Sequence, residues 1–244
     1  MNEELQDLTQ VSWHFGQFSF FNPPIKPYTG KDGVKYSARL VPQCTMDVKT
    51  LWSLITADKM LESLTESLRS LQTDAERREF KSTKLAYVTP CGVFSKRGAK
   101  NVTSLSGLVV LDIDHLGSLE EAEWMRDWLF DDPSLVPLLA FVSPSGLGVK
   151  LFVPYVFKLG CSVGCYSLEQ FETDGWQPST ENLKTVSEQI LFGMDYLNMK
   201  LIRASESGLT RKQLECDFSG KDVSRACFLG YDAHARYREI SEID

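Results

Sequence analysis

The sequence predicts an α+β fold in which a group of helices precedes a sheet. Three apolar runs of strand length lie in the middle of the chain, at 108–113, 137–142 and 149–155, and they predict buried strands. In the first half, apolar residues recur at helical spacing and predict helices at about 47–57 and 58–71. We interpret these helices as an accessory layer in front of the sheet.

Shorter signals predict the remaining elements. Ser118 and Glu121 form a capping box that begins a helix ending near Phe130. Periodicity and turn residues predict a strand at 11–21, a loop at 26–37, a third helix at 74–82, a loop at 159–179, a long helix from about 180 to 199, a loop at 203–213 and a strand at 226–229. We expect residues 1–83 to hold the first strand and the helical layer, and residues 84–244 to hold the core, although both can form one continuous domain.

Composition and charge limit the classes of protein to consider. The chain has 244 residues, of which 43% are hydrophobic, and a net charge of −7. No apolar run is long enough to span a membrane, and the N-terminus is polar and acidic, unlike a signal peptide. We therefore expect a cytoplasmic protein with reduced cysteines and no membrane partner. The one close cysteine pair, Cys161 and Cys165, has no further soft ligand nearby in the sequence for a zinc ion.

Two aspartates mark the end of the first apolar run. Asp112 and Asp114 are two residues apart, so on a strand their side chains point to the same face. Because two like charges at the end of a core strand repel each other, a divalent cation is the usual remedy. Carboxylate oxygens suit Mg²⁺ or Mn²⁺, and such ions support phosphoryl transfer. The simpler alternative is a pair of strand-end carboxylates facing water.

A serine- and glycine-rich connection links the second and third apolar runs. It contains Ser143, Ser145, Gly146 and Gly148, which allow a close backbone approach and leave amides and hydroxyls free for an anion. Lys150 lies just beyond it and can supply a flexible positive charge for a phosphate. The pattern therefore predicts a nucleotide-binding loop, although a plain hairpin turn has the same composition.

A third polar segment lies near the C-terminus. Asp217 is placed to complete a metal site with the first two aspartates, and Arg225 can hold a triphosphate. Asp222 is the fallback for the third carboxylate. The alternative is a turn in which Asp217 or Asp222 caps backbone amides and Arg225 forms a surface ion pair.

Taken in order, these motifs resemble those of the archaeo-eukaryotic primase superfamily. The chain resembles most closely the VirE N-terminal domain family, the primase-like module of Bacteroides mobile elements and phages. The matching stretches are 88–94, 105–116, 143–150 and 224–228, and the resemblance spans roughly residues 10–235. It implies a primase-polymerase fold with an RRM-like mixed or antiparallel sheet, two metal ions, a nucleoside triphosphate substrate and a single-stranded DNA template.

The resemblance also bears on individual residues. Asp217 aligns best with the family's third aspartate, since a Ser-Arg pair follows it at a similar distance. Primases of the superfamily usually place a histidine where this chain has Lys150. Lysine can neutralise a phosphate but cannot act as a neutral donor.

Basic residues are few near these motifs. The acidic balance of the chain argues against a large non-specific nucleic-acid surface. Lys84, Lys96 and Arg97 flank the predicted strand region at 87–94, so we predict that they contact nucleic acid locally.

Three functional hypotheses remain open. The first is a primase-polymerase-type nucleotidyltransferase in the replication of a mobile element or phage, here as the N-terminal module of a longer replication protein. The second is a catalytically silent module of the same fold that binds DNA or a helicase partner. The third is a phosphatase of the haloacid-dehalogenase type, which also begins with Asp-x-Asp but expects Thr or Val where this chain has Leu116.

Overall fold

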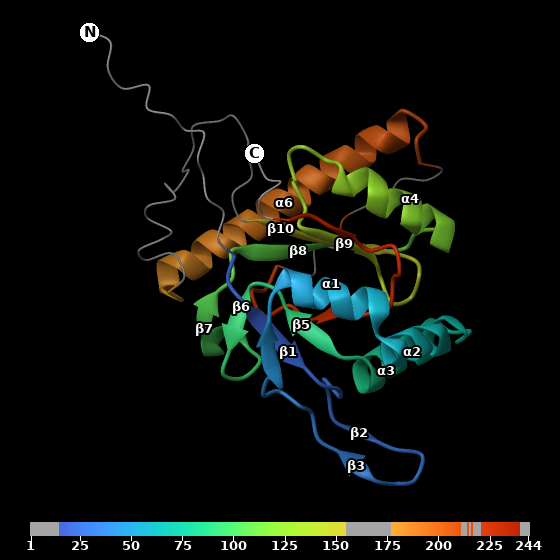
Figure 1. The fold of residues 1–244 in the computed structure, drawn as a ribbon, viewed down its shortest axis with the longest axis vertical. Helices are drawn as coiled ribbons and strands as arrows, with labels where there is room; N and C mark the ends of the chain where they lie inside the picture. The colour runs from blue at the N-terminus through green and yellow to red at the C-terminus, as the bar shows by residue number, and fades with distance from the viewer. Residues whose placement is uncertain (1–14, 155–176, 211–213, 215, 217–220, 240–244) are drawn as a thin grey trace.

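The computed structural model describes residues 15–154, 177–210, 214, 216 and 221–239. Two four-stranded antiparallel sheets dominate it (Figure 1). The first sheet has the strand order β11 (Cys227–Phe228), β5 (Tyr87–Thr89), β1 (Phe18–Phe21) and β4 (Cys44–Met46). The second sheet has the order β12 (Arg236–Tyr237), β9 (Leu139–Val142), β10 (Val149–Pro154) and β8 (Leu108–Ile113). The α+β class predicted from the sequence is confirmed, with all strand pairs antiparallel.

Five helices are present among the described residues: α1 (Val48–Ala57), α2 (Lys59–Arg69), α3 (Asp74–Lys84), α4 (Leu119–Phe130) and α6 (Thr180–Glu206), besides a short 3-10 turn, η1 (Ala99–Asn101). The predicted capping box at Ser118 is present in part, since its hydroxyl accepts a hydrogen bond from the amide of Glu121. None of the described helices is both long enough and apolar enough to cross a membrane.

The helix α6 is longer than the sequence analysis predicted. Its expected end near residue 199, and the loop expected from 203, are wrong because the helix continues to Glu206. The apolar stripe that includes Ile190 and Leu197 continues through Leu201 and Ala204, and all four side chains are buried. Burial of this stripe against the second sheet extends the helix by two turns.

The region predicted as a loop at 26–37 also differs from expectation. It contains a small hairpin, β2 (Tyr28–Thr29) and β3 (Lys35–Tyr36), which projects from the body of the protein in Figure 1. The turn between the strands includes Gly33 at φ 77°. The predicted strand at 11–21 is shorter within the described residues, where it runs from Phe18 to Phe21. A second small pair consists of β6 (Gly92–Phe94) and β7 (Val102–Leu105).

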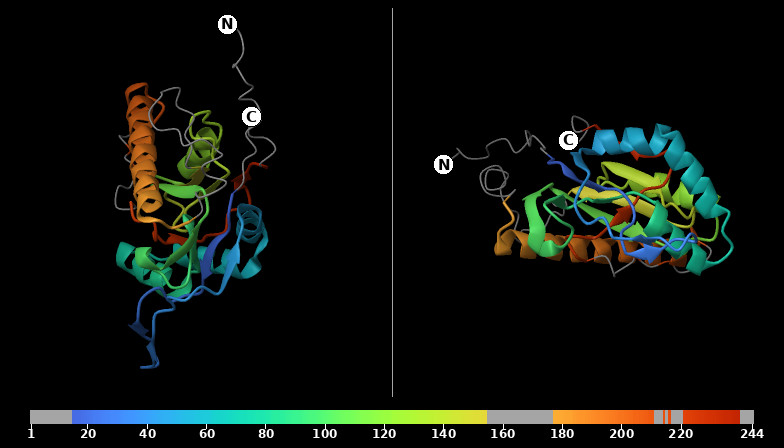
Figure 2. Two further views of the ribbon diagram at one scale, coloured as in Figure 1. Left: turned by 90° about the vertical axis from the view of Figure 1, so that its left-hand side faces the viewer. Right: turned by 90° about the horizontal axis from the view of Figure 1, so that it is seen from below.

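The second sheet is buried on both faces, which explains its nearly continuous apolar strands. On the outer face, Leu111 and Leu151 pack in a core with helices α4 and α6, which lie along that face in Figures 1 and 2. On the inner face, Val110 and Phe152 pack in a second core with the first sheet and helix α1. The inner face of β8 and β10 is therefore turned toward the first sheet, and it is this face that leads to the candidate site.

Candidate functional site

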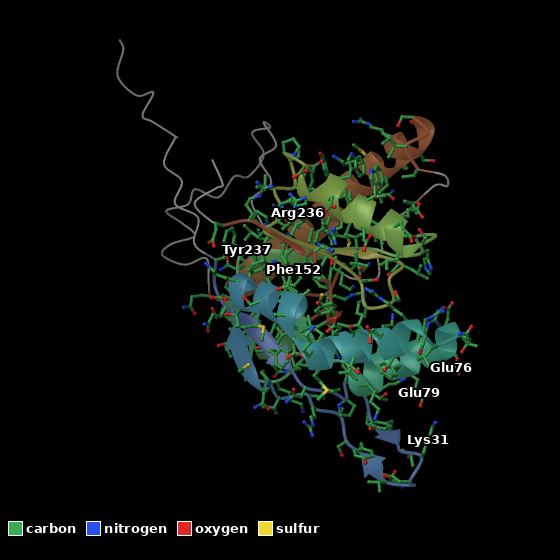
Figure 3. The ribbon with its side chains drawn as sticks, turned by 45° about the vertical axis from the view of Figure 1, so that its right-hand side comes forward. Lys31, Glu76, Glu79, Phe152, Arg236 and Tyr237 are labelled. Carbon is green, nitrogen blue, oxygen red and sulfur yellow. The ribbon has the colours of Figure 1, made fainter. Side chains whose placement is uncertain are left out.

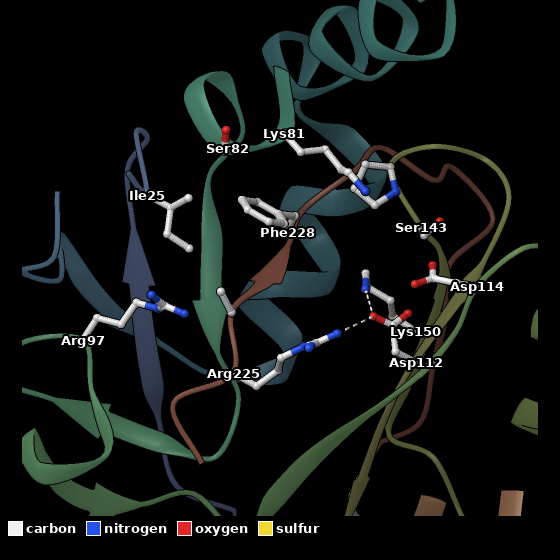
Figure 4. Close-up of a pocket in the computed structure, with 12 residues that line it drawn as sticks. Ile25, Lys81, Ser82, Arg97, Asp112, Asp114, Ser143, Lys150, Arg225 and Phe228 are labelled. Atoms are coloured by element: carbon white, nitrogen blue, oxygen red, sulfur yellow. Dashed lines mark hydrogen bonds and ion pairs between the residues drawn. The ribbon is translucent and has the colours of Figure 1, made fainter. Parts of the chain in front are cut away.

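A cavity of about 420 Å³ lies between the two sheets, where β8 ends and β10 begins (Figure 4). Both sheets and the end of helix α3 contribute to its walls. The lining residues are Ile25, Lys81, Ser82, Arg97, Asp112, Asp114, Ser143, Pro144, Lys150, Arg225, Ala226 and Phe228. The volume lies within the range typical of small-molecule sites.

The alternation of side chains along the strands places two charged residues in this cavity. On β8, Leu108 and Val110 face the first sheet, and Asp112 follows at the same two-residue spacing. On β10, Lys150 shares the face of Phe152 and lies directly opposite Asp112 in the strand register. The strands thus bring a carboxylate and an ammonium together at the cavity wall.

Asp112 and Lys150 form a buried ion pair. The Lys150 Nζ lies 2.5 Å from Asp112 Oδ2, and each residue is 8% exposed. Burial is the largest single influence and lowers the pKa of Lys150, but attraction to Asp112, together with Cys227, Asp114 and the hydrogen bond to Asp112, outweighs it, so the pKa is raised and the ammonium is retained. The guanidinium of Arg225 is 3.8 Å from the same carboxylate oxygen. The other oxygen, Asp112 Oδ1, is buried without a hydrogen-bond partner among the described residues.

Asp114 follows the end of β8 and also lines the cavity. The neighbouring loop approaches it closely at Gly148. A Cβ added to Gly148 would lie 2.4 Å from the carbonyl oxygen of Ile113 and 3.0 Å from Asp114 Oδ1. Glycine is therefore required where the loop passes over the second aspartate.

The loop between β9 and β10 is a tight turn held by its own hydrogen bonds. The Ser143 amide donates to the Gly148 carbonyl at 2.8 Å, and the Gly146 amide donates to the Ser143 carbonyl at 2.9 Å. Gly146 has φ 77°, which favours glycine. Arg69 on α2 donates from Nε to the Pro144 carbonyl at 3.2 Å, so the loop is also fixed from outside.

Three further cations line the cavity, each from a segment other than β8 and β10. Lys81 comes from the last turn of α3, Arg97 from the segment after β6, and Arg225 from the segment before β11. Burial, and then repulsion from Lys150, lower the pKa of Lys81. The Nε of Arg97 is buried with no hydrogen-bond acceptor among the described residues. Four cations and two carboxylates therefore face one cavity, an arrangement suited to an anion of high charge.

The structure brings together only part of the predicted site. Six of the predicted residues line the cavity, namely Asp112, Asp114, Ser143, Lys150, Arg225 and Arg97, the last of which the sequence analysis assigned to nucleic acid. Ser145, Gly146 and Gly148 shape the loop without lining the cavity. Lys84 and Lys96 are exposed and lie outside the lining.

Of the two candidates for the third carboxylate, Asp217 and Asp222, the structure describes only Asp222. Asp217 lies outside the described residues. Asp222 is described, and its carboxylate accepts hydrogen bonds from the Ser224 amide and hydroxyl, at 2.9 and 3.0 Å. Asp222 thus caps a turn before Arg225, and it does not line the cavity. Lys81 is the charged lining residue that the sequence analysis left out of the site, because only the tertiary fold brings the end of α3 to the cavity.

Two of the residues that line the cavity could serve as ligands of a divalent cation. Asp112 Oδ1 is a buried oxygen without a hydrogen-bond partner in the described part of the chain, and the Asp114 carboxylate is adjacent. Hard anionic oxygens of this kind suit Mg²⁺ or Mn²⁺. No group of three or more metal-ligating side chains occurs within the described residues. Asp217, which we predicted as the third carboxylate, lies outside them.

Comparisons with known proteins give one match. Residues 80–162, less than half of the chain, match the model of the family described as BT4734-like, N-terminal domain. That stretch contains β8, β9, β10 and the two aspartates of the cavity. Searches of curated proteins and of solved structures gave no match.

Proposed function

We propose that this chain is a primase-polymerase-type nucleotidyltransferase that acts on nucleoside triphosphates with a DNA template, in the replication of a mobile element or phage. The observation that carries the proposal is the convergence of two aspartates and four cations on one cavity. The motif order that resembles the VirE-type primase modules supports it, as does the antiparallel sheet that bears the aspartates. We take this sheet to be the RRM-like core of the superfamily.

In this proposal the cations hold the triphosphate. Arg225 and Arg97 can each present two parallel donors to phosphate oxygens, and Lys81 supplies a point charge. The burial of the cavity wall strengthens these attractions, because water screens them less there. The Ser143 hydroxyl is placed to donate to a further oxygen.

In the same proposal, the aspartates would bind the divalent metal ions. Asp112 and Asp114, with Asp217 as the third ligand, are the residues that we expect to bind Mg²⁺ or Mn²⁺. When bound, such ions supply charge neutralisation for the attacking hydroxyl and for the pyrophosphate leaving group. Burial raises the pKa of Asp112, and the ammonium of Lys150 opposes that shift while it orients the carboxylate, so the second oxygen can accept a cation.

The experiment that tests the proposal compares wild type with Asp114→Asn and with Asp195→Asn, an exposed carboxylate on α6 that serves as the matched control. Incorporation of labelled ribo- and deoxyribonucleotides is measured on primed and unprimed single-stranded DNA with either metal. Asp114→Asn should lower incorporation on the order of 100-fold or more, and Asp195→Asn should not. Incorporation that survives in Asp114→Asn would place the site elsewhere.

The second candidate is a non-catalytic module of the same fold that binds DNA or a helicase. The Asp112–Lys150 pair favours it, since an ammonium already neutralises one of the two carboxylates. The non-catalytic hypothesis is favoured if folded wild type incorporates no nucleotide with either metal on any template but still binds DNA. Release of phosphate from a phosphomonoester by wild type, lost in Asp112→Asn, would instead favour the haloacid-dehalogenase-type reaction.

A further inference from the structure

Positive charge is concentrated in two segments of this acidic chain. Residues 22–46 and 80–111 carry nine of the 26 lysine and arginine residues but one of the 33 acidic residues, Asp32. The rest of the chain therefore carries 17 basic and 32 acidic residues. We call the surface formed by these two segments the basic face.

Hydrogen bonds join the two segments side by side. The Ile25 amide donates to the Ser82 carbonyl at 2.9 Å, and the Arg97 amide donates to the Leu40 carbonyl at 2.7 Å. The Tyr87 hydroxyl donates to the Arg39 carbonyl at 3.1 Å. The β2–β3 hairpin extends outward from this junction, with Lys31 near its tip in Figure 3. The charges are thus gathered in space as well as in sequence.

The hairpin carries an aromatic pair beside these charges. The rings of Tyr28 and Tyr36 stack with centroids 4.8 Å apart and an interplanar angle of 10°. The ammonium of Lys84 lies 5.8 Å from the Tyr28 ring, and Tyr36 is 40% exposed. Exposed rings next to lysines are the combination on which unpaired bases stack while the backbone is neutralised.

The basic face is continuous with the cavity. Ile25, Lys81 and Arg97 belong to its two segments and also line the cavity. A strand held along the basic face would therefore lie beside the cavity that Asp112 and Asp114 line (Figure 4).

We propose that the basic face binds single-stranded DNA and leads it into the cavity. Charge complementarity to the phosphate backbone argues for a nucleic acid, and the stacked tyrosine pair, of which Tyr36 is exposed and Tyr28 half-buried, argues for an unpaired strand. The inference that the bound strand serves as a template rests on the proposed function, whereas the inference that the basic face binds DNA does not. The net negative charge of the rest of the chain confines the DNA to this face.

The test measures the fluorescence anisotropy of a labelled oligothymidine of about 20 nucleotides, long enough to cover the face, in EDTA and without nucleotide. Lys35→Glu/Lys84→Glu should weaken binding at least about tenfold and make its salt dependence shallower. Lys59→Glu/Lys184→Glu reverses two exposed charges on α2 and α6 and should bind within about twofold of wild type. Equal weakening by both pairs would overturn the proposal, since only net charge would then matter.

Aromatic variants separate stacking from charge. Tyr28→Ala/Tyr36→Ala should weaken binding, whereas Tyr28→Phe/Tyr36→Phe, which keeps both rings, should bind like wild type. Duplex DNA that binds as tightly as the single strand would overturn the assignment of an unpaired strand. An RNA strand of equal length that binds about tenfold tighter would overturn the assignment of DNA.

The two proposals can fail separately. Asp114→Asn should bind the oligonucleotide at least as tightly as wild type, because it removes a negative charge from the cavity that receives the strand, even though it is expected to lose incorporation. If wild type incorporates nucleotides while the hairpin variants bind DNA normally, the binding inference is wrong and the proposed function stands. If wild type incorporates no nucleotide while the hairpin variants lose DNA binding, the proposed function is wrong and the binding inference stands.

Discussion

Lys150 lies directly across the β8–β10 ladder from Asp112, and its Nζ is 2.5 Å from Asp112 Oδ2. The sequence analysis expected a flexible cation beyond a glycine-rich loop. The structure instead shows a side chain that the strand register holds in place and that is 8% exposed. Because both charges are buried, each needs the other, and Lys150 contributes to the stability of the fold as well as to the charge of the cavity.

The pair predicts a non-additive effect on stability. Lys150→Met leaves the Asp112 carboxylate buried with Arg225 as a distant partner, and it should lower the free energy of unfolding by about 3–5 kcal/mol. Asp112→Leu/Lys150→Met, which removes both charges, should recover most of that loss. Urea unfolding of the single and double variants measures the coupling.

The exposed Lys59 provides the control for this cycle. It pairs with Glu62 at the surface, and Lys59→Met should leave the free energy of unfolding close to that of wild type. Losses that simply add in the Asp112/Lys150 double variant would mean that the two charges are not coupled.

Gly148 predicts a steric effect next to the second aspartate. In Gly148→Ala the new methyl group would meet backbone, the Ile113 carbonyl oxygen at 2.4 Å, so either the loop or the strand must shift. We expect a loss of about 1–3 kcal/mol in the free energy of unfolding. Gly117→Ala is the matched control, because its methyl group would meet the movable carboxylate of Glu121 at 2.9 Å. Equal stability of the two variants would show that the loop does not need glycine there.

A second buried ion pair holds the C-terminal segment on the second sheet. Arg126 Nη1 donates to both oxygens of Asp232, at 2.9 and 3.0 Å, and Asp232 also accepts from the Val142 amide at 2.8 Å. Arg126→Met should cost about 3–5 kcal/mol because it leaves Asp232 buried without its cation. Arg126→Lys retains the charge but not the guanidinium fork, so its melting temperature should fall between those of Arg126→Met and wild type. A melting temperature of Arg126→Met equal to wild type would exclude a stabilising role.

Cysteine reactivity provides a test of burial near the cavity. Burial raises the pKa of both Cys227 and Cys91 to about 12, so at pH 8 almost none of either thiol is the reactive thiolate. Iodoacetamide at pH 8 should therefore modify the exposed Cys44 in the native protein and modify Cys227 and Cys91 only in denaturant. Mass spectrometry of the peptides assigns each site. Rapid native modification of Cys227 would show that water reaches the first sheet beside Arg225.

Local signals were enough to predict the helices of the first half. The apolar spacing of α2 is strictly local, and the structure adds side-chain caps at Asp58 and Thr73, which begin α2 and α3 through hydrogen bonds to the backbone. The two-residue spacing of Asp112 and Asp114 likewise predicts that they share a face, and both line the cavity.

Contacts between distant segments could not be predicted in this way. The Lys150–Asp112 pair depends on the register of two strands, and Lys81 reaches the cavity only through the tertiary arrangement of the chain. The hairpin at Tyr28 and Tyr36 was missed because strands of two residues carry almost no periodicity. The extension of α6 to Glu206 depends on burial that propensity alone does not reveal.

The central position of β5 in the first sheet has a consequence for any shortened form of the protein. This strand is paired on one side with β1 and on the other with β11, while β9 in the second sheet is paired with β12. A fragment cut to the family match, residues 80–162, would keep β5 and β9 but lose these three partners. Its unpaired strand edges would then be open to other copies of the fragment, and aggregation rather than a small working core is the expected fate. We therefore expect that the stretch matched by the family model, residues 80–162, does not fold as a soluble unit on its own.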